Sequence, residues 1–138
     1  MKKVILSIGL GLVAASGLAQ VVNSAKIHIS EGALVSFGPE VNNSGEIINN
    51  GKVHLKGDLK NNSKIVSKGD IVIDGTTPQT ISGTQVVEMS RISVENDVML
   101  QTPVSVSEEV SFRKGIVSSN NGSALELGDN ATQNGASD

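Results

Sequence analysis

The sequence contains no cysteine, tryptophan or tyrosine, and only two phenylalanines, Phe37 and Phe112, among its 138 residues. Without cysteine the chain has no disulfide framework, no lipid-anchored cysteine and no thiolate metal site. Sites that bind glycans or nucleic-acid bases by stacking use exposed aromatic faces, and this chain has almost none to offer. Backbone hydrogen bonds and an aliphatic core must therefore hold the fold together.

Basic residues are also few, with 11 Lys and Arg against 14 Asp and Glu, so the formal net charge is −3. Removal of Lys2 and Lys3 with a cleaved leader would lower it to −5, since −3 − 2 = −5. Nucleic acids and anionic membrane surfaces are bound through basic patches. The composition therefore predicts no nucleic-acid partner and no membrane insertion of the processed chain.

The N-terminus has the pattern of a secretory signal peptide. Lys2 and Lys3 precede an apolar stretch at residues 4–15, and the small residues of Gly17-Leu18-Ala19 suit a signal peptidase. The stretch is too short to span a membrane with these flanks. A buried core helix is the alternative, but nothing else in the chain predicts a helix for it to pack on. We predict a signal peptide at residues 1–19 and one domain at residues 20–138.

Glycine recurs every sixth residue through the middle of the chain, at positions 45, 51, 57, 69 and 75, with Ser63 in the one gap. A short fixed period is typical of β-solenoids, in which each hexad forms one side of a coil. Residues 45–62 also align with residues 63–80 after a shift of 18, which is three sides and therefore one turn. The shift places Val53 on Ile71 and Asn49 on Ser67.

Charged residues change sign across the same shift. Like charges directly across a strand pair repel, so parallel stacking requires such reversals. The predicted charge pairs are Glu46 with Lys64, Lys52 with Asp70, and Lys56 with Asp74. Asn43 and Asn61 also lie one turn apart, and stacked asparagines can hydrogen-bond along a solenoid.

The register extends in both directions from this central repeat. Backward, it predicts that Ile29, Val35, Phe37 and Val41 lie one coil before Ile47, Val53, Leu55 and Leu59. Forward, the phase breaks between residues 76 and 88, around Pro78 and Gly83. Apolar pairs at i and i+2, which share a face of a strand, then return every six residues. These inward pairs are Ile92/Val94, Val98/Leu100, Val104/Val106 and Val110/Phe112, with Ile116 continuing the series and Leu125/Leu127 starting another short strand.

Two architectures fit short strands separated by regular turns. Antiparallel hairpins with Asn-Gly turns predict mirror-like pairing across each turn, whereas the charge pairs repeat by translation and favour parallel stacking. Two aliphatic residues per hexad also exceed the single large aliphatic typical of left-handed hexapeptide helices. We predict an all-β fold, a parallel β-solenoid of about five coils of about 18 residues each, with a right-handed β-helix favoured.

Four runs resemble a known group of proteins: GTTPQTISG at residues 75–83, ISVEN at 92–96, SFRKGIVSSNNGSALELGDNAT at 111–132 and GASD at 135–138. They are similar to the N-terminal repeat region of secreted, β-helix-like surface proteins of the Bacteroidetes. The resemblance implies export across both membranes, with display at the cell surface or release. Longer members look as though they continue to a C-terminal sorting domain of the type IX secretion route. By this resemblance, the 20–138 domain could be truncated at its C-terminus. No catalytic residues come with the resemblance.

Asp70 and Asp74 form the most suggestive carboxylate pair, because some β-helix enzymes cleave polysaccharides with aspartates. Four residues apart on one strand, they would be separated by roughly 13 Å, whereas glycosidase carboxylates lie about 5 to 9.5 Å apart. Each aspartate also has a lysine one coil below. We therefore interpret the two aspartates as partners in a charge ladder and predict no catalytic residue.

The sequence supplies no convincing metal or cofactor site. The only histidines, His28 and His54, are not separated by one repeat, so they do not stack, and they have no third ligand. Asp129 and Asn130 alone fall far short of the six to eight oxygens that Ca²⁺ requires. We interpret these residues as solvent-facing.

These observations predict a non-catalytic segment of a secreted or cell-surface protein, with a structural or adhesin-like role. Its flat polar faces would meet an unidentified surface ligand or glycan. An unpaired strand edge after Leu127 would favour end-to-end self-association. The alternative is a fragment of a polysaccharide-acting β-helix enzyme or a glycan-binding module, which a close aspartate cluster or a groove with exposed aromatics would indicate.

Overall fold

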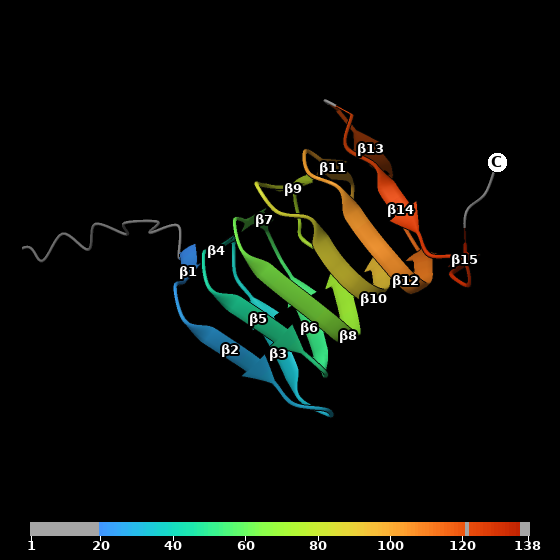
Figure 1. The fold of residues 1–138 in the computed structure, drawn as a ribbon. Coiled ribbons are helices and arrows are strands. Elements are labelled where there is room, and N and C mark those ends of the chain that lie inside the picture. Colours follow the sequence, from blue (N-terminus) through green and yellow to red (C-terminus); the bar gives the residue numbers. More distant parts are fainter. Residues whose placement is uncertain (1–19, 121, 136–138) are drawn as a thin grey trace, which may run out of the picture.

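A computed structural model describes residues 20–120 and 122–135 of the chain, and the predicted signal peptide lies outside these residues. The described residues form β-strands joined by short turns, and the strands pair in parallel throughout. Together they build a solenoid of six turns (Figure 1). The predicted parallel β-solenoid is confirmed, with six turns in place of about five. No helix in the described part of the chain has the length and apolar character needed to cross a membrane.

Each turn has up to three faces, which we name A, B and C. Face A contains β1 (Gln20–Asn23), β4 (Glu40–Asn43), β7 (Asp58–Asn61), β9 (Gln79–Gly83), β11 (Val98–Leu100) and β13 (Val117–Ser119). Face B begins with β2 (Lys26–Ile29) and β5 (Glu46–Asn49) and ends with β14 (Leu125–Leu127). Face C begins with β3 (Leu34–Phe37) and β6 (Lys52–Leu55) and ends with β15 (Thr132–Asn134). In the middle turns the long strands β8 (Lys64–Ile73), β10 (Val87–Val94) and β12 (Val104–Phe112) cross both B and C.

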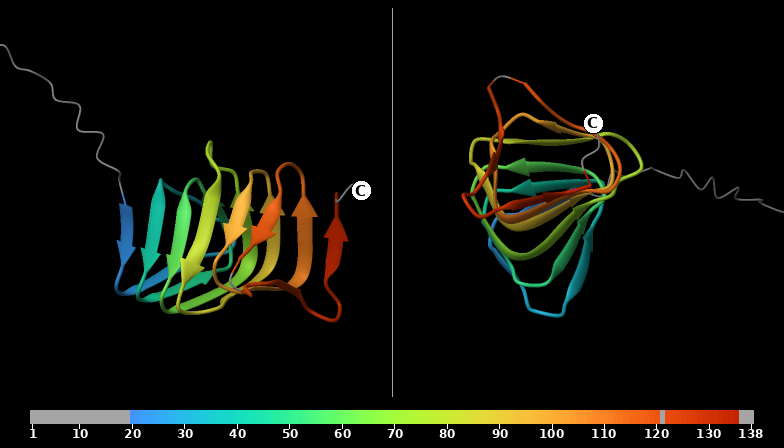
Figure 2. Two further views of the ribbon diagram at one scale, coloured as in Figure 1. Left: turned by 90° about the horizontal axis from the view of Figure 1, so that it is seen from above. Right: turned by 90° about the vertical axis from the view of Figure 1, so that its right-hand side faces the viewer.

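The coil is right-handed. Seen from its C-terminal end, the chain turns anticlockwise as it advances toward the viewer (Figure 2). Right-handed crossovers dominate between parallel strands because twisted strands pack back onto their sheet most easily in that sense. The favoured hand is therefore the one observed.

The core is a continuous aliphatic column inside the coil. Alternate residues of each strand point inward, and the inward residues of successive turns stack on one another. Pairs that the repeat predicted, such as Val53 with Ile71 and Leu55 with Ile73, are in register and buried. The core residues include Val41, Ile47, Val53, Leu55, Leu59, Ile65, Ile71, Ile73, Ile81, Ile92, Val94, Val98, Leu100, Val104, Val106 and Val110.

The predicted register of the first turn is wrong at Ile29. Ile29 pairs with Asn49, and Ile27 takes the predicted place beside Ile47. The cause is the turn between β2 and β3, which spans residues 30–33, whereas the equivalent turn between β5 and β6 spans only residues 50–51. The sequence offset between paired residues is therefore longer for β2 with β5 than for β3 with β6. After this turn the predicted register holds, and Val35 lies beside Val53.

The predicted inward position of Ile116 is also wrong. Ile116 is 69% exposed, and Val117 pairs with Val98 in its place. The offset between β11 and β13 exceeds the central repeat by one residue, and a shift of one residue turns every side chain to the other face of a strand.

Asparagines at strand ends tie the turns together. On face A, Asn23 Nδ2 donates to Asn43 Oδ1 at 2.8 Å, and Asn43 Nδ2 donates to Asn61 Oδ1 at 2.9 Å. On the B side, Asn49 Nδ2 donates to Ser67 Oγ at 2.9 Å. The Asn49 Oδ1 atom also accepts from the Gly51 amide at 3.0 Å, which closes the corner. The predicted stacking of Asn43 on Asn61 and of Asn49 on Ser67 is confirmed.

Glycine is required where corners of adjacent turns meet. A Cβ atom on Gly57 would lie 1.5 Å from the carbonyl oxygen of Pro39, and one on Gly69 would lie 1.9 Å from that of Gly51. No side chain fits at such distances from the backbone below. The glycines therefore recur every six residues because the corners of adjacent turns stack too closely for any other residue.

Candidate functional site

A column of charged residues with alternating sign runs along face C. Lys52 on β6 lies beside Asp70 on β8, Asp70 lies beside Arg91 on β10, and Arg91 lies beside Glu109 on β12. All four project outward, because the residues that follow them, among them Val53 and Ile71, are in the core. We call these four residues the charged column.

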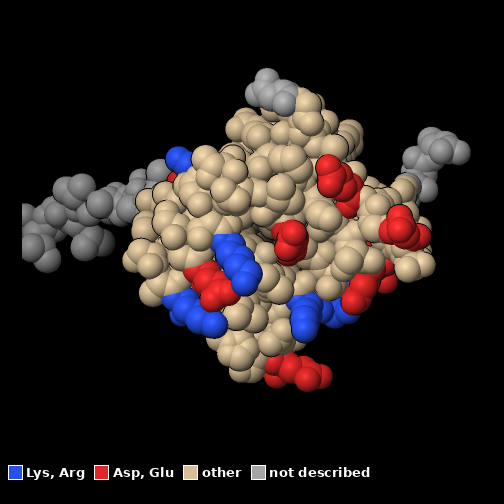
Figure 3. Space-filling view, viewed as in Figure 1, with Lys and Arg blue, Asp and Glu red and all other residues tan. Residues whose placement is uncertain are grey.

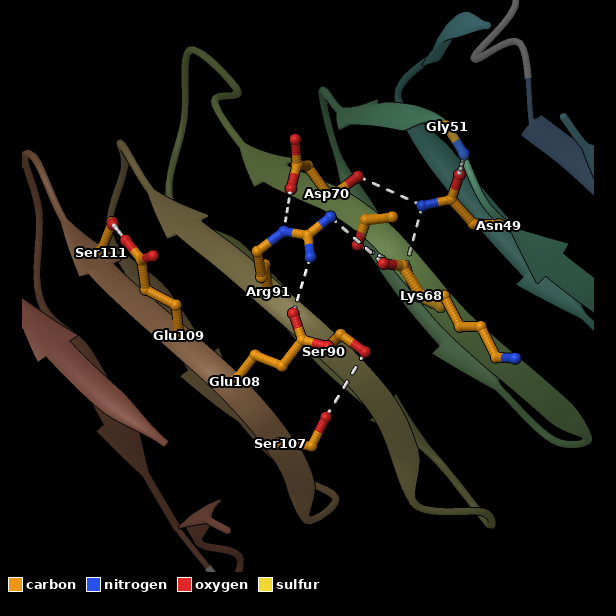
Figure 4. A network of polar contacts seen from close by, with 12 residues as sticks. Asn49, Gly51, Lys68, Asp70, Ser90, Arg91, Ser107, Glu108, Glu109 and Ser111 are labelled. Carbon is orange, nitrogen blue, oxygen red and sulfur yellow. Dashed lines mark hydrogen bonds and ion pairs between the residues drawn. The ribbon is translucent and has the colours of Figure 1, made fainter. Parts of the chain in front are cut away.

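Arg91 is the most connected member of the charged column (Figure 4). Its Nε donates to Asp70 Oδ1 at 2.6 Å and its Nη1 to Glu108 Oε2 at 2.7 Å. Its Nη2 donates to the Lys68 carbonyl oxygen at 3.2 Å. The hydrogen bonds with Asp70 and Glu108 raise the pKa of Arg91 above its ordinary value. One guanidinium thereby connects three consecutive turns.

A second row of charged residues lies four residues further along the chain, one residue beyond the ends of β6, β8, β10 and β12. It consists of Lys56, Asp74, Glu95 and Arg113, and the backbone hydrogen bonds of these residues run from one turn to the next. Asp74 Oδ2 accepts from Lys56 Nζ at 2.5 Å and lies 2.7 Å from His54 Nδ1. Burial opposes ionisation of Asp74, but the bonds from Lys56 and His54 outweigh it and hold the pKa of this carboxyl below its ordinary value.

Small side chains occupy the strand positions between the charged column and this second row. Val72, Ser93 and Ser111 are in register across β8, β10 and β12. Although Val72 projects outward, it is only 4% exposed. A hollow of about 300 Å³ lies over these residues, bounded by Lys52, Asp70, Arg91 and Glu109 on one side and by Glu95 and Arg113 on the other. We call this hollow the axial trough, because it crosses the strands and follows the solenoid axis.

The floor of the axial trough is bonded to its walls. Ser93 Oγ donates to Glu95 Oε1 at 3.2 Å, and Ser111 Oγ donates to Glu109 Oε1 at 2.6 Å. Asn134 Nδ2 also donates to Glu109, at 2.9 Å. The bonds from Ser111 and Asn134 lower the pKa of Glu109. The carboxylates are thus held in fixed orientations by neighbours in the sheet.

Face B carries a shorter ladder of the same kind. Glu46 lies 3.2 Å from Lys64 on the next turn and 3.2 Å from Lys26 on the turn before. Hydrogen bonds from Lys64 and Lys26 lower the pKa of Glu46. Figure 3 shows this row of basic, acidic and basic side chains over β2, β5 and β8. Both lysines of this row pair with Glu46, which leaves a surplus of one positive charge there.

The two aspartates weighed as a catalytic pair have separate partners. Asp70 bonds to Arg91 and Asp74 bonds to Lys56 and His54, with Val72 between them on the strand. The predicted register of both with lysines of the turn below is confirmed, although Asp70 takes its ion pair from the turn above. The interpretation of both as ladder members is therefore supported.

The other candidates lie apart from one another. His28 is on face B, where its Nε2 lies 3.2 Å from Asn50 Nδ2, while His54 is on face C. Asp129 and Asn130 are exposed in the turn between β14 and β15. Within residues 20–120 and 122–135, no group of three or more histidine, aspartate or glutamate side chains is placed to hold a metal ion.

Sequence reasoning missed Arg91 and Glu109 as members of the charged column. Asp70 and Arg91 are further apart in the sequence than one central repeat, and β10 carries a register shift between Met89 and Arg91. A fixed shift therefore cannot align them. The sequence does carry one sign of them: charge continues to alternate from Asp70 to Arg91 to Glu109. The alternation is visible only if the offset from Asp70 to Arg91 is taken as three residues longer than the central repeat.

Comparison of the chain with protein-family models, with curated proteins and with solved structures found no match.

Proposed function

We propose that this chain is a non-catalytic segment of an exported protein, which acts as a stiff scaffold with an adhesin-like surface at, or released from, the cell exterior. The observation that carries the proposal is the cross-turn bonding of polar side chains. The asparagine ladder, the Glu46 ladder and the charged column each connect three or more turns. Such ladders favour a uniform rod whose faces repeat along one axis.

The export part of the proposal is supported by the sequence of residues 1–19 and by the resemblance to surface proteins. It is tested by expressing the full chain in a bacterium with a tag after Asp138 and fractionating the cells. We expect an exported species whose mass places its first residue at Gln20. Leu12→Arg in the apolar stretch should abolish export, whereas Leu34→Arg, at an exposed position of β3, should not. Retention of the uncleaved chain in the cytoplasm would refute export.

The non-catalytic part is supported by the way the carboxylates of face C are engaged with basic and hydroxyl side chains. It is tested by incubating the purified protein with a panel of polysaccharides, with and without added Ca²⁺. We expect no turnover. Turnover that Asp70→Asn or Asp74→Asn removes would show that the ladder interpretation is wrong and that the chain belongs to a polysaccharide-acting enzyme.

End-to-end self-association is part of the same proposal. Within the described residues, β14 and β15 each pair only with β12, and Leu127 is 43% exposed. Open strand edges pair readily with other chains. We expect the 20–138 chain to sediment as larger species at higher concentration, and Leu127→Lys to reduce this. A monomer at every concentration would contradict it.

A further inference from the structure

We infer that the axial trough binds a neutral, hydroxyl-rich ligand, namely a segment of an uncharged oligosaccharide chain lying along the solenoid axis. This inference deepens the adhesin-like part of the proposed function and rests on it. Its basis is the shape of the trough, the balance of its charges and the hydrogen-bonding groups of its walls.

The shape follows from the register of the sheet. Outward residues two apart on a strand are separated by about 7 Å, and neighbouring strands by about 4.8 Å. Long charged side chains therefore border a central row of short ones, Val72, Ser93 and Ser111, over three successive turns. The hollow of about 300 Å³ is at the lower end of the range for small-ligand sites. Its length lies along the axis, so it suits an extended ligand.

The charges of the lining residues cancel. Lys52, Arg91 and Arg113 contribute three positive charges, and Asp70, Glu95 and Glu109 contribute three negative charges. A polyanion such as a uronate chain would meet the three carboxylates, and a basic peptide would meet the three cations. Like charges brought together across an interface oppose binding. The balance therefore favours an uncharged polar ligand.

The walls present donors and acceptors side by side. Arg113 is 70% exposed, and among the described residues its ion pair is with Glu95 alone and spans 3.9 Å, so most of its donors face solvent. Glu95 and Glu109 each accept a hydroxyl bond through one oxygen, Oε1. In the part of the chain that the structure describes, the Oε2 atom of each makes no hydrogen bond, which leaves it for a ligand. A sugar hydroxyl both donates and accepts and matches such a surface. Charged partners also make stronger hydrogen bonds than neutral ones.

The trough is pre-organised. Most of its side chains project from strands that are paired on both sides. Arg91 and Glu109 are also each fixed by two or more hydrogen bonds. Little side-chain freedom is then lost when a ligand binds. Without an aromatic platform we expect a dissociation constant of about 1 mM, at the weak end of specific binding.

The test is a titration of the isotope-labelled protein with maltohexaose, cellohexaose and hexagalacturonate, followed by amide chemical shifts. We expect at least one neutral hexasaccharide to shift the amides of Val72, Ser93 and Ser111, with hexagalacturonate weaker. Ser93→Leu, which fills the floor, should weaken binding by roughly tenfold. Ser105→Leu, at a half-buried outward position of β12 on face B, is the matched control and should bind like the wild type.

Arg113→Ala is a second variant that avoids the packed part of the sheet, and it should weaken binding several-fold without changing the melting temperature. Unchanged trough amides with both neutral hexasaccharides would overturn the inference. Tighter binding of hexagalacturonate, or equal loss in Ser93→Leu and Ser105→Leu, would overturn it as well. Because the titration needs no export, its failure leaves the scaffold and export proposal standing, and failed export leaves the titration valid.

Discussion

Arg91 Nε lies 2.6 Å from Asp70 Oδ1, so these two side chains join β10 in the fourth turn of the solenoid to β8 in the third. The same guanidinium reaches Glu108 on the fifth turn at 2.7 Å. All three side chains are about half exposed. Solvent screens such pairs, and exposed ion pairs contribute about 0 to 1 kcal/mol to stability. The charged column therefore sets the relative register of turns more than it stabilises them.

The aliphatic core should dominate stability. We expect Ile71→Ala to lower the free energy of unfolding by roughly 2 to 5 kcal/mol, because it removes buried methyl groups and leaves a cavity between turns. Asp70→Ala, on the same strand but facing solvent, should cost less than about 1 kcal/mol. Chemical denaturation of both variants would measure the difference. A larger loss for Asp70→Ala would mean that the inward and outward faces are misassigned.

Corner glycines should be far less tolerant of a methyl group than their backbone angles suggest. Gly57→Ala would place Cβ against the Pro39 carbonyl at 1.5 Å, which forces the second and third turns apart. We expect a large loss of stability, well above the roughly 1 kcal/mol typical of point variants. Gly128→Ala is the matched control, because its Cβ would be no closer than 3.3 Å to any neighbouring atom. Equal melting temperatures for the two variants would contradict close stacking at the corner.

The inward asparagines should be essential where their outward neighbours are not. Asn43 is fully buried and bonds to both Asn23 and Asn61. Asn43→Ala would remove its buried hydrogen bonds with both Asn23 and Asn61, and the loss of such bonds should cost about 1 to 3 kcal/mol. Asn42→Ala, one residue earlier and facing outward, should be nearly neutral. Thermal melts of the two variants test this, and a reversed order would show that the ladder does not stabilise the solenoid.

Much of the fold was predictable because stacked turns require similar residues at a fixed spacing in the sequence. Gly57 and Gly69 mark corners, and Val53 and Ile71 repeat at the spacing of one turn. The predictions failed where a turn changed length, as at residues 30–33 before β3 and at the register shift before Arg91. Loop length is set by local geometry that leaves no periodic signal, so Ile29 and Ile116 were misplaced.

The candidate site was less predictable than the fold for the same reason. Each wall residue was visible as a charge, but the axial trough exists only because Val72, Ser93 and Ser111 come into register. The offset from Val72 to Ser93 is longer than the offset from Ser93 to Ser111. No single repeat length therefore aligns all three residues. Residues with short side chains also indicate no hollow until the longer side chains that lie on either side of them in the sheet have been identified.

Asp74 should make the stability of the solenoid sensitive to acid. Its side chain is 15% exposed and bonds to Lys56 and His54, and its pKa in the folded chain lies below the ordinary value of 3.8. A carboxyl whose pKa is lower in the folded state binds fewer protons there than in the unfolded state. Its stabilising contribution is therefore complete above the unfolded pKa and is lost as the pH falls through the folded pKa.

We accordingly expect Asp74→Asn to lower the melting temperature at pH 7 and to have a much smaller effect at an acidic pH low enough to protonate the wild-type carboxyl in the folded chain. Melting curves across this range would measure the two differences. Asp129→Asn, in the exposed turn before β15, is the control and should change the melting temperature little at either pH. If Asp74→Asn destabilised the protein equally at both pH values, its effect would come from lost packing or altered hydrogen bonding. The ion pair with Lys56 would then contribute nothing measurable to the fold.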